Sequence, residues 1–304
     1  MPNTIAHLGV GELLTRRLLP KAERKWIYLG CILPDLPWIA RRVLSALPTG
    51  VDPYDLRLYA VAQSSLLVTL LLAGALAAIS KAPRIVFAVL TLNCLIHLLL
   101  DAAQTKWGNG VHLIAPISWK VWNFGLFWPE SIITALLTLA GAALYALAWR
   151  SREDRCVVTV PQRHRLATAA ALGAAYLMLP LFFLASVERA NNLNVRTLRD
   201  PNNRTGRPIQ LDRVRYLARD DGDRLRTYVG EELTVEQSVL GHDATVSVHA
   251  VFVDSGTVRI DRLHEHFGQW RNVASIIGLI AVVLYWCRPW LGFRPGDTNE
   301  GAMR

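Results

Sequence analysis

The sequence predicts a mainly α-helical integral membrane protein, with about five transmembrane helices, N-terminal interfacial helices and a small all-β extramembrane domain. Two observations support this fold class. The chain of 304 residues is 52% hydrophobic, and its apolar residues gather in long uncharged runs, which are typical of membrane-spanning helices. Residues 188–268 are instead charged and polar, with the alternation of residue types that indicates β-strands.

Residues 1–57 form the first part of the chain. They contain two short amphipathic segments, 7–19 and 22–29, with basic residues between them, and this spacing predicts helices. Trp26 and Trp38 suit the layer between lipid and water. We expect this part to lie on the bilayer edge, or to dip into it, without spanning it.

Four apolar runs form a predicted membrane region over residues 58–187, and a fifth run lies in residues 269–304 together with a basic tail. Each run is about long enough to cross the hydrocarbon core. Pro180 predicts a kink in the fourth run, which a bilayer helix tolerates. The predicted spans are 58–80, 84–101, 128–149, 166–187 and 272–287.

The polar segment 188–268 is the predicted β-domain. VRYLA and RLRTYV flank the turn DDGD, and ATVSVHAVFV runs through DSG into TVRI; such alternation around Gly/Asp turns predicts hairpins. The domain contains no Gly-rich phosphate loop and no serine nucleophile elbow. It could cover a substrate site, bind a protein partner or act as a spacer, and the sequence leaves these roles open.

The formal net charge is +9, but the basic residues lie in short clusters beside apolar runs. This placement indicates membrane topology and contact with anionic lipid rather than nucleic-acid binding. The basic stretch 150–165 and the C-terminal tail would be cytoplasmic by the positive-inside rule, so that the β-domain faces outward. The lysines and arginines of residues 1–57 favour the opposite orientation. Four widely spaced cysteines predict no disulfide framework: Cys31, Cys94, Cys156 and Cys287.

The sequence HLLLD contains the first candidate for chemistry. It places His97 and Asp101 four residues apart, and therefore on one face of a helix, where both can reach a common ion. Ionisable groups at the end of a span are costly and usually functional. The alternative is a satisfied polar pair at a helix terminus.

Topology adds three further candidate ligands. The parity of the spans places His7, Asp35 and His112 on the same membrane face as the HLLLD pair, whichever face that is. These are nitrogen and oxygen donors of the kind that a zinc-like ion prefers. Asp35 lies between two prolines in ILPDLPW, a pattern that by itself predicts a turn and that would hold a ligand rigidly.

Three motifs, taken in order, resemble a known family. NTIAHLGVG, GCILPDLPW and IHLLLDAAQTKWG before Pro116 are similar to the motifs of the membrane-bound metal-dependent hydrolases, which are bacterial inner-membrane proteins remotely similar to zinc-dependent phospholipase C. The resemblance covers about residues 1–150. It implies a multi-pass inner-membrane protein whose candidate metal ligands are the following four residues: His7, Asp35, His97 and Asp101.

The sequence departs from the family at one place. The family usually has an Arg-Gly and a His-Ser motif just before or within the first span, whereas this chain reads RLYAVAQSSLL, with Gln63 and Ser64 and no histidine. Glutamine is a poor zinc ligand. The site would therefore bind metal weakly, recruit His112 instead, or have lost catalysis.

The expected activity is metal-assisted hydrolysis of a phosphoester or ester in an amphiphilic, lipid-type substrate, with zinc as the expected divalent ion. Asp35 or Asp101 would bridge ions or accept the water proton, and Lys106 or an N-terminal arginine would neutralise a phosphate. The alternative is a non-catalytic membrane scaffold or regulator that displays the β-domain to a partner. A transporter is disfavoured because no span is clearly broken by Gly or Pro at mid-membrane around a charge.

Two weaker signals lie elsewhere in the chain. The sequence His264-Glu265-His266 precedes the last span and predicts a solvated charge cluster rather than a second metal site, although on a strand both histidines share a face. The tryptophans predict an interfacial belt. Trp107, beside the candidate ligands, could also contact a substrate.

Overall fold

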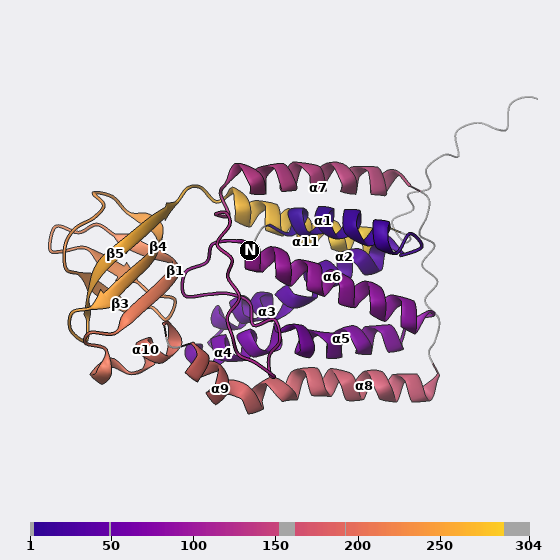
Figure 1. The fold of residues 1–304 in the computed structure, drawn as a ribbon, viewed down its shortest axis with the longest axis horizontal. Helices are drawn as coiled ribbons and strands as arrows, with labels where there is room; N and C mark the ends of the chain where they lie inside the picture. Colours follow the sequence, from indigo (N-terminus) through magenta and orange to yellow (C-terminus); the bar gives the residue numbers. More distant parts are fainter. Residues whose placement is uncertain (1–2, 49, 152–161, 192, 289–304) are drawn as a thin grey trace, which may run out of the picture.

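The helices form a bundle and a small β-barrel lies beyond one end of it (Figure 1). The computed structural model describes residues 3–48, 50–151, 162–191 and 193–288. The helices and 3₁₀ turns of the bundle are α1 Thr4–Leu18, α2 Arg24–Ile32, η1 Leu33–Asp35, α3 Leu36–Ser45, α4 Pro53–Gln63, α5 Leu66–Ala78, α6 Pro83–Ala103, α7 Ile132–Arg150, α8 Arg163–Met178, η2 Leu179–Phe183, α9 Leu184–Ala190 and α11 Trp270–Cys287.

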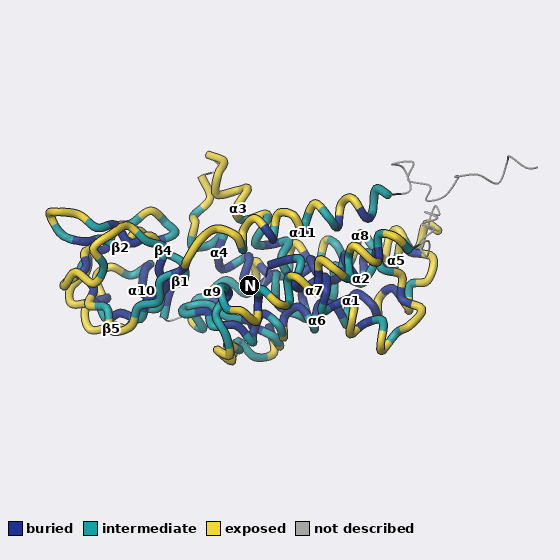
Figure 2. The backbone as a smooth tube through the Cα atoms, turned by 90° about the horizontal axis from the view of Figure 1, so that it is seen from above, coloured by how far each residue is buried: buried dark blue, intermediate teal, exposed yellow. Residues whose placement is uncertain are grey.

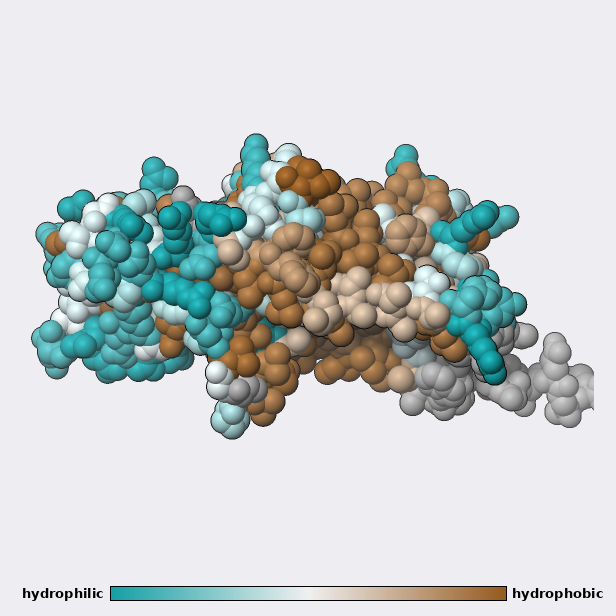
Figure 3. Space-filling view, turned by 90° about the horizontal axis from the view of Figure 1, so that it is seen from below, coloured by the Kyte–Doolittle hydropathy of each residue, from teal (hydrophilic) through white to brown (hydrophobic). Residues whose placement is uncertain are grey.

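Four helical segments of the described chain are long and apolar enough to cross a membrane: Pro83–Ala103, Ile132–Arg150, Arg163–Ala190 and Trp270–Cys287. In the last three, only 17% to 22% of the apolar window is buried inside the protein, against 56% in the first. Figure 3 shows the result, an apolar belt between the hydrophilic barrel and the opposite end of the bundle. An exposed apolar surface of this extent fits a lipid environment.

The first predicted span, 58–80, is not one continuous helix. α4 and α5 meet at an angle of 69°, and only if this bent pair is counted does the number of candidate spans rise from four to five. The break falls at two serines. The hydroxyls of Ser64 and Ser65 donate to the carbonyls of Val61 and Ala62, at 3.2 and 2.8 Å. Such local bonds offer the backbone an alternative to the helical ladder.

The two N-terminal helices, which the sequence placed at the edge of the bilayer without spanning it, pack into the bundle and are not among the candidate spans of the described chain. α1 contacts α2, α6, α7 and α11, and Figure 2 shows that buried residues concentrate along the middle of the bundle. Glycines permit this packing. A Cβ added at Gly9 would lie 2.4 Å from Cα of Gly141 in α7, and one at Gly278 of α11 would lie 2.6 Å from Cβ of Thr4. Small residues of this kind let membrane helices approach closely.

Proline and cysteine positions follow the sequence prediction where they are described. The helix that begins at Arg163 becomes 3₁₀ at Leu179–Phe183, around Pro180, because proline has no N–H to donate. Cys31, Cys94 and Cys287 are free. Cys156 and most of the basic stretch 150–165, as well as the C-terminal tail, lie outside the described residues.

The predicted β-domain is a closed five-stranded barrel with the strand order β1-β2-β3-β5-β4. Both predicted hairpins are present: Tyr216 pairs with Leu225 across β1 and β2, and Ala250 pairs with Ile260 across β4 and β5. β3 and β5 pair in parallel and close the barrel. The strands are β1 Pro208–Leu217, β2 Arg224–Arg226, β3 Glu232–Val235, β4 Ala244–Phe252 and β5 Thr257–His266.

The barrel begins later in the chain than the sequence suggested. Residues before Pro208 are helical, in α9, α10 Val195–Arg199 and η3 Pro201–Asn203. Val195 and Leu198 of α10 are fully buried, Val195 against α4 and Leu198 in the barrel core. Short helices therefore link the bundle to the barrel and bury apolar side chains on both sides.

Candidate metal centre

The candidate ligands lie at the end of the bundle that faces the barrel. His7 comes from the first turns of α1, Asp35 from the 3₁₀ turn η1, and His97 and Asp101 from the last turns of α6. The two prolines around Asp35 end α2 and begin α3, so this turn joins two helices. The spacing of four residues places His97 and Asp101 on one face of α6, as the sequence predicted.

Three of these residues form a buried group whose ligand atoms all lie within 4.8 Å of one another: His7, His97 and Asp101. His7 Nε2 lies 3.4 Å from Asp101 Oδ1, and His97 Nε2 lies 3.8 Å from Asp101 Oδ2. The two imidazole rings stack, with their centroids 3.9 Å apart. Asp35 Oδ1 approaches from the other side, 3.5 Å from His97 Nε2.

The orientation of His97 is set by the backbone of α2. Its Nδ1 lies 2.6 Å from the carbonyl oxygen of Cys31, and because a carbonyl can only accept, Nδ1 is the donor. In the neutral ring, Nε2 then presents a lone pair toward the carboxylates of Asp35 and Asp101. Metal-ligating histidines are commonly oriented in this way, by donating their other ring nitrogen to a carbonyl or carboxylate.

Several ligand atoms of this group are buried without a hydrogen-bond partner among the described residues. They are both ring nitrogens of His7, Nε2 of His97, Oδ1 of Asp35 and Oδ1 of Asp101. Buried polar groups are normally satisfied, and lone pairs that face one another repel unless a proton or a metal cation lies between them. The donor set therefore fits a divalent ion with nitrogen and oxygen ligands.

Lys106 and His112 lie near this group but not within it. Lys106 Nζ is buried and lies 3.1 Å from Asp101 Oδ2. His112 is one of the residues that line the neighbouring cavity, but its Nδ1 bonds to the carbonyl of Trp119 at 3.0 Å, and it is not part of the group of three. Burial lowers the pKa of His112 despite that bond, which keeps the ring neutral near pH 7.

Gln63 and Ser64, where the sequence departs from the motif of the family that it resembles, lie at the bend between α4 and α5. Gln63 is buried and its Nε2 donates to the hydroxyl of Tyr59 at 3.1 Å and to the carbonyl of Tyr176 at 3.4 Å. Its neighbour Ser64 lines the cavity beside the candidate ligands. The bend between α4 and α5 thus turns residue 64, not residue 63, toward the site.

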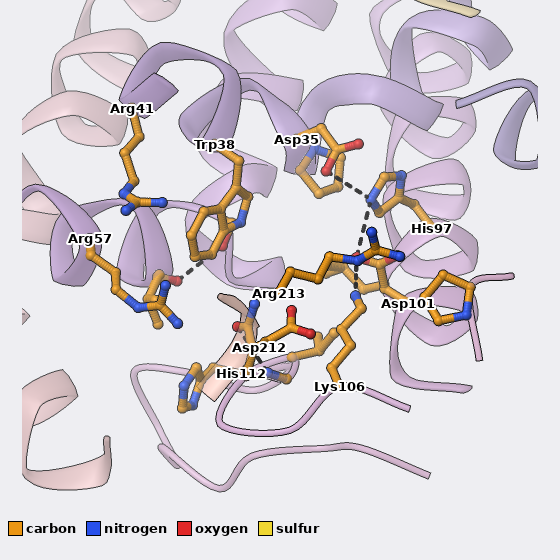
Figure 4. A pocket seen from close by; sticks show the side chains of 18 of the residues that line it. Asp35, Trp38, Arg41, Arg57, His97, Asp101, Lys106, His112, Asp212 and Arg213 are labelled. Atoms are coloured by element: carbon orange, nitrogen blue, oxygen red, sulfur yellow. Dashed lines mark hydrogen bonds and ion pairs between the residues drawn. The ribbon is translucent and has the colours of Figure 1, made fainter. Parts of the chain in front are cut away.

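A cavity of about 260 Å³ opens beside the candidate ligands. Figure 4 shows Asp35, His97 and Asp101 on one side of it and Trp38 with two arginines on the other. The barrel contributes Asp212, Arg213 and Tyr228 to its wall. The cationic residues that line it outnumber the acidic ones; they are Arg41, Arg42, Arg57, Lys106, Arg213 and Arg271.

Sequence reasoning missed most of this basic lining. The arginines come from α3, α4, β1 and α11, and they converge only when the barrel lies against the bundle. Arg213 has φ of 53°, which is uncommon for a residue with a side chain. The register shift between Leu211 and Val214 shows that it lies in a β-bulge, and bulges re-aim side chains, here toward the cavity.

A second group of potential ligands joins the barrel to the bundle: Glu130, His264 and His266. It is not the solvated cluster that we expected. His266 is buried, its Nδ1 contacts Glu130 Oε1, and its Nε2 lies 2.7 Å from the hydroxyl of Ser247. Arg213 Nη2 lies 3.0 Å from the same Glu130 oxygen. Both ring nitrogens of His266 and one oxygen of Glu130 therefore already have partners, whereas Glu130 Oε2 and His264 Nε2 have none among the described residues.

Aromatic rings pack around the same junction. The ring of His264 stacks on Trp128 at 3.6 Å. Trp107, for which the sequence left contact with a substrate open, packs edge-on against Trp128 at 5.2 Å and against His249 of the barrel at 4.2 Å. These tryptophans hold the barrel to the loop that precedes α7.

No protein-family model, curated protein or solved structure matches this chain.

Proposed function

We propose that this protein is a membrane-bound, metal-dependent hydrolase that acts on a phosphoester or ester of an amphiphilic, lipid-type substrate. One observation carries the proposal: buried, unpartnered imidazole and carboxylate atoms converge beside a cavity with a basic lining, at the end of an apolar helical bundle. The order of the three sequence motifs that resemble the membrane-bound metal-dependent hydrolases points the same way.

The residues divide into three roles. His7, His97, Asp101 and Asp35 would hold a divalent ion, with zinc as the first choice for two imidazoles and two carboxylates. Such an ion lowers the pKa of water and polarises a phosphoryl or acyl oxygen. The side chain of Asp35 is 14% exposed, more than those of the other three residues. It is therefore the carboxylate best placed to accept a proton from water.

Lys106 and the arginines supply positive charge. Lys106 Nζ lies against Asp101, at the edge of the ligand group, where it can pair with a phosphate oxygen of the substrate. The ammonium then serves two anions, one from the protein and one from the substrate. Charge-assisted hydrogen bonds of this kind are shorter and stronger than neutral ones. The basic lining also attracts an anionic substrate and raises its local concentration.

An amphiphilic substrate follows from where the cavity lies. His97 and Asp101 belong to the end of the apolar helix α6, and Figure 3 shows that an apolar belt covers the bundle next to the hydrophilic barrel. A headgroup can enter the basic cavity while an acyl or prenyl chain stays in the lipid. This arrangement removes the need to extract the whole substrate from the bilayer.

Elemental analysis of the purified full-length protein tests the proposal. We expect bound zinc, manganese or iron in the wild type and its loss in His97→Ala. His242→Ala is the matched control, because His242 is 60% exposed and lies on the barrel, away from the cavity. Hydrolysis of chromogenic phosphate esters in detergent micelles should follow the metal content. Wild-type protein without any of these metals would refute the hydrolase and leave the scaffold as the better reading.

The proposed location is the bacterial inner membrane, with the barrel on the extracytoplasmic side. The exposed turn Pro201–Asn203 reports it. In intact cells, an impermeant thiol reagent should label the Asn202→Cys variant more than the parent protein, which has no cysteine at this position. Labelling only after lysis would reverse the orientation, yet it would leave the ligand group and the cavity on one face.

A further inference from the structure

The side of the cavity opposite the candidate ligands contains two arginines without acidic partners. Arg41 of α3 and Arg57 of α4 both line the cavity, and Arg57 is only 7% exposed. In each, Nε is buried without a hydrogen-bond partner among the described residues. None of the ion pairs found in the described chain includes either residue, although ten other arginines and lysines there are paired with carboxylates.

Two aromatic rings enclose these guanidinium groups. The central carbon of Arg57 lies 4.6 Å from the ring centre of Tyr228 and 6.0 Å from that of Trp38. The same carbon of Arg41 lies 5.2 Å from Tyr228 and 5.9 Å from Trp38. These distances are within the range of cation–π contacts, and Nε of each arginine remains without a hydrogen-bond partner among the described residues.

Two like charges held together in this way are unfavourable without an anion. Burial, and then the neighbouring Arg57, lower the pKa of Arg41 to about 10, so Arg41 still carries a charge at pH 7. A buried charge without a counter-ion is costly. The aromatic rings offset part of this cost. An anion that accepts several N–H bonds would offset the rest of this cost, and the oxygens of phosphate match the planar fork of arginine.

We propose that Arg41 and Arg57, between Trp38 and Tyr228, form a phosphate-binding subsite, so that the substrate headgroup carries a second phosphate besides the one at the candidate metal centre. Arg41 follows Asp35 by six residues, which is about 9 Å along the axis of α3. The two arginines and the candidate ligands lie on opposite sides of the cavity (Figure 4), so a headgroup with two phosphates can contact both sides at once. The phosphate at the candidate metal centre rests on the proposed hydrolase function, whereas the phosphate at Arg41 and Arg57 does not.

The subsite also assigns a role to the barrel. Tyr228 lies between β2 and β3, and it packs on both arginines and, edge-on, on Tyr54 of α4 at 6.1 Å. The barrel thus completes the binding pocket instead of only capping the bundle. Among the roles that the sequence left open for the β-domain, this favours the covering of a substrate site.

Calorimetric titration of the full-length protein in detergent tests the subsite. In EDTA, inorganic phosphate should bind the wild type, and Arg57→Gln and Arg41→Gln should each weaken this binding at least about tenfold, because a charge-assisted bond is lost. Arg57→Lys keeps the charge without the fork and should fall between. Arg215→Gln is the matched control, since it removes an exposed arginine of β1 that does not line the cavity.

A second set of titrations tests the second phosphate. In protein that contains its metal, methylenediphosphonate should bind at least tenfold more tightly than phosphate, and Arg41→Gln should remove this advantage. Farnesyl diphosphate that binds more tightly still would identify a lipid headgroup as the source, and equal binding would identify a free diphosphate. Unchanged binding in folded Arg41→Gln and Arg57→Gln would overturn the subsite. A wild type that lacks metal would refute the hydrolase alone, because the titration in EDTA still reports on the arginines.

Discussion

Two groups of histidine and carboxylate lie at the same end of the bundle, and they differ in how their polar atoms are satisfied. In the first, His7, His97 and Asp101 leave nitrogen and oxygen atoms without partners among the described residues. In the second, both ring nitrogens of His266 are engaged, and Arg213 neutralises Glu130. Composition alone does not separate the two groups. The state of their lone pairs does.

The difference indicates different tasks. An unpartnered group of acceptors is an incomplete coordination shell, whereas a group with a built-in guanidinium is a structural joint between barrel and bundle. In the second group only Glu130 Oε2 and His264 Nε2 are buried without a partner. This comparison predicts which substitutions change metal binding and which change stability.

The largest expected effect is on metal affinity in the first group. His7→Ala and Asp101→Asn should each lower it more than about 100-fold, because the loss of outer partners alone costs 10–100-fold. His264→Ala should leave the metal content unchanged. Competition with a chelator of known affinity measures all three. Equal metal loss in His264→Ala would remove the distinction between the groups.

The second group should govern stability. Glu130→Gln leaves His266 and Arg213 without their acidic partner, and we expect a loss of about 1–3 kcal/mol in unfolding free energy. Thermal unfolding in detergent measures it, with Glu265→Gln as the control, because Glu265 pairs only with the exposed His242 on the barrel. Metal content should stay the same. A variant as stable as the wild type would show that the junction does not hold the barrel.

A smaller effect is expected at Gln63 and Ser64, where the sequence departs from the motif that it otherwise resembles. Ser64 lines the cavity whereas Gln63 bonds away from it. Ser64→His should therefore raise metal affinity, on the order of tenfold, which is the lower end of what one added partner contributes. Gln63→His should not raise it, and should instead lose the bonds to Tyr59 and Tyr176. The same chelator competition decides between the two positions.

The smallest effect is a pH dependence confined to acid. Burial raises the pKa of Glu130, but the hydrogen bond and charge of His266 and the charge of Arg213 outweigh it and hold the pKa below the ordinary value of 4.5. The contribution of Glu130 to stability is thus fully present above pH 4.5 and is lost as the pH falls through the lowered value. Unfolding midpoints should separate wild type from Glu130→Gln less and less below pH 4.5. A separation that stays constant down to pH 3 would contradict this assignment.

The sequence predicted individual elements better than their assembly. Both hairpins of the barrel and the face shared by His97 and Asp101 follow from local periodicity, which neighbours in the chain determine. The break at Ser64 and Ser65 was missed, because a long apolar run hides a local competition for backbone bonds. The inward position of α1 was missed for another reason. Its glycines permit close packing, but they do not say against which helix.

By itself, the sequence determined the apolar runs, the hairpins and the residues that could share one membrane face, since these depend on composition, spacing and parity. The tertiary structure decided which of them meet. It brings His7 against His97, leaves His112 outside that group, and places Arg41 and Arg57 beside Tyr228 of the barrel. Such contacts join residues that are far apart in the chain, so no local pattern encodes them. They depend on the packing of the helices on one another and of the barrel on the bundle.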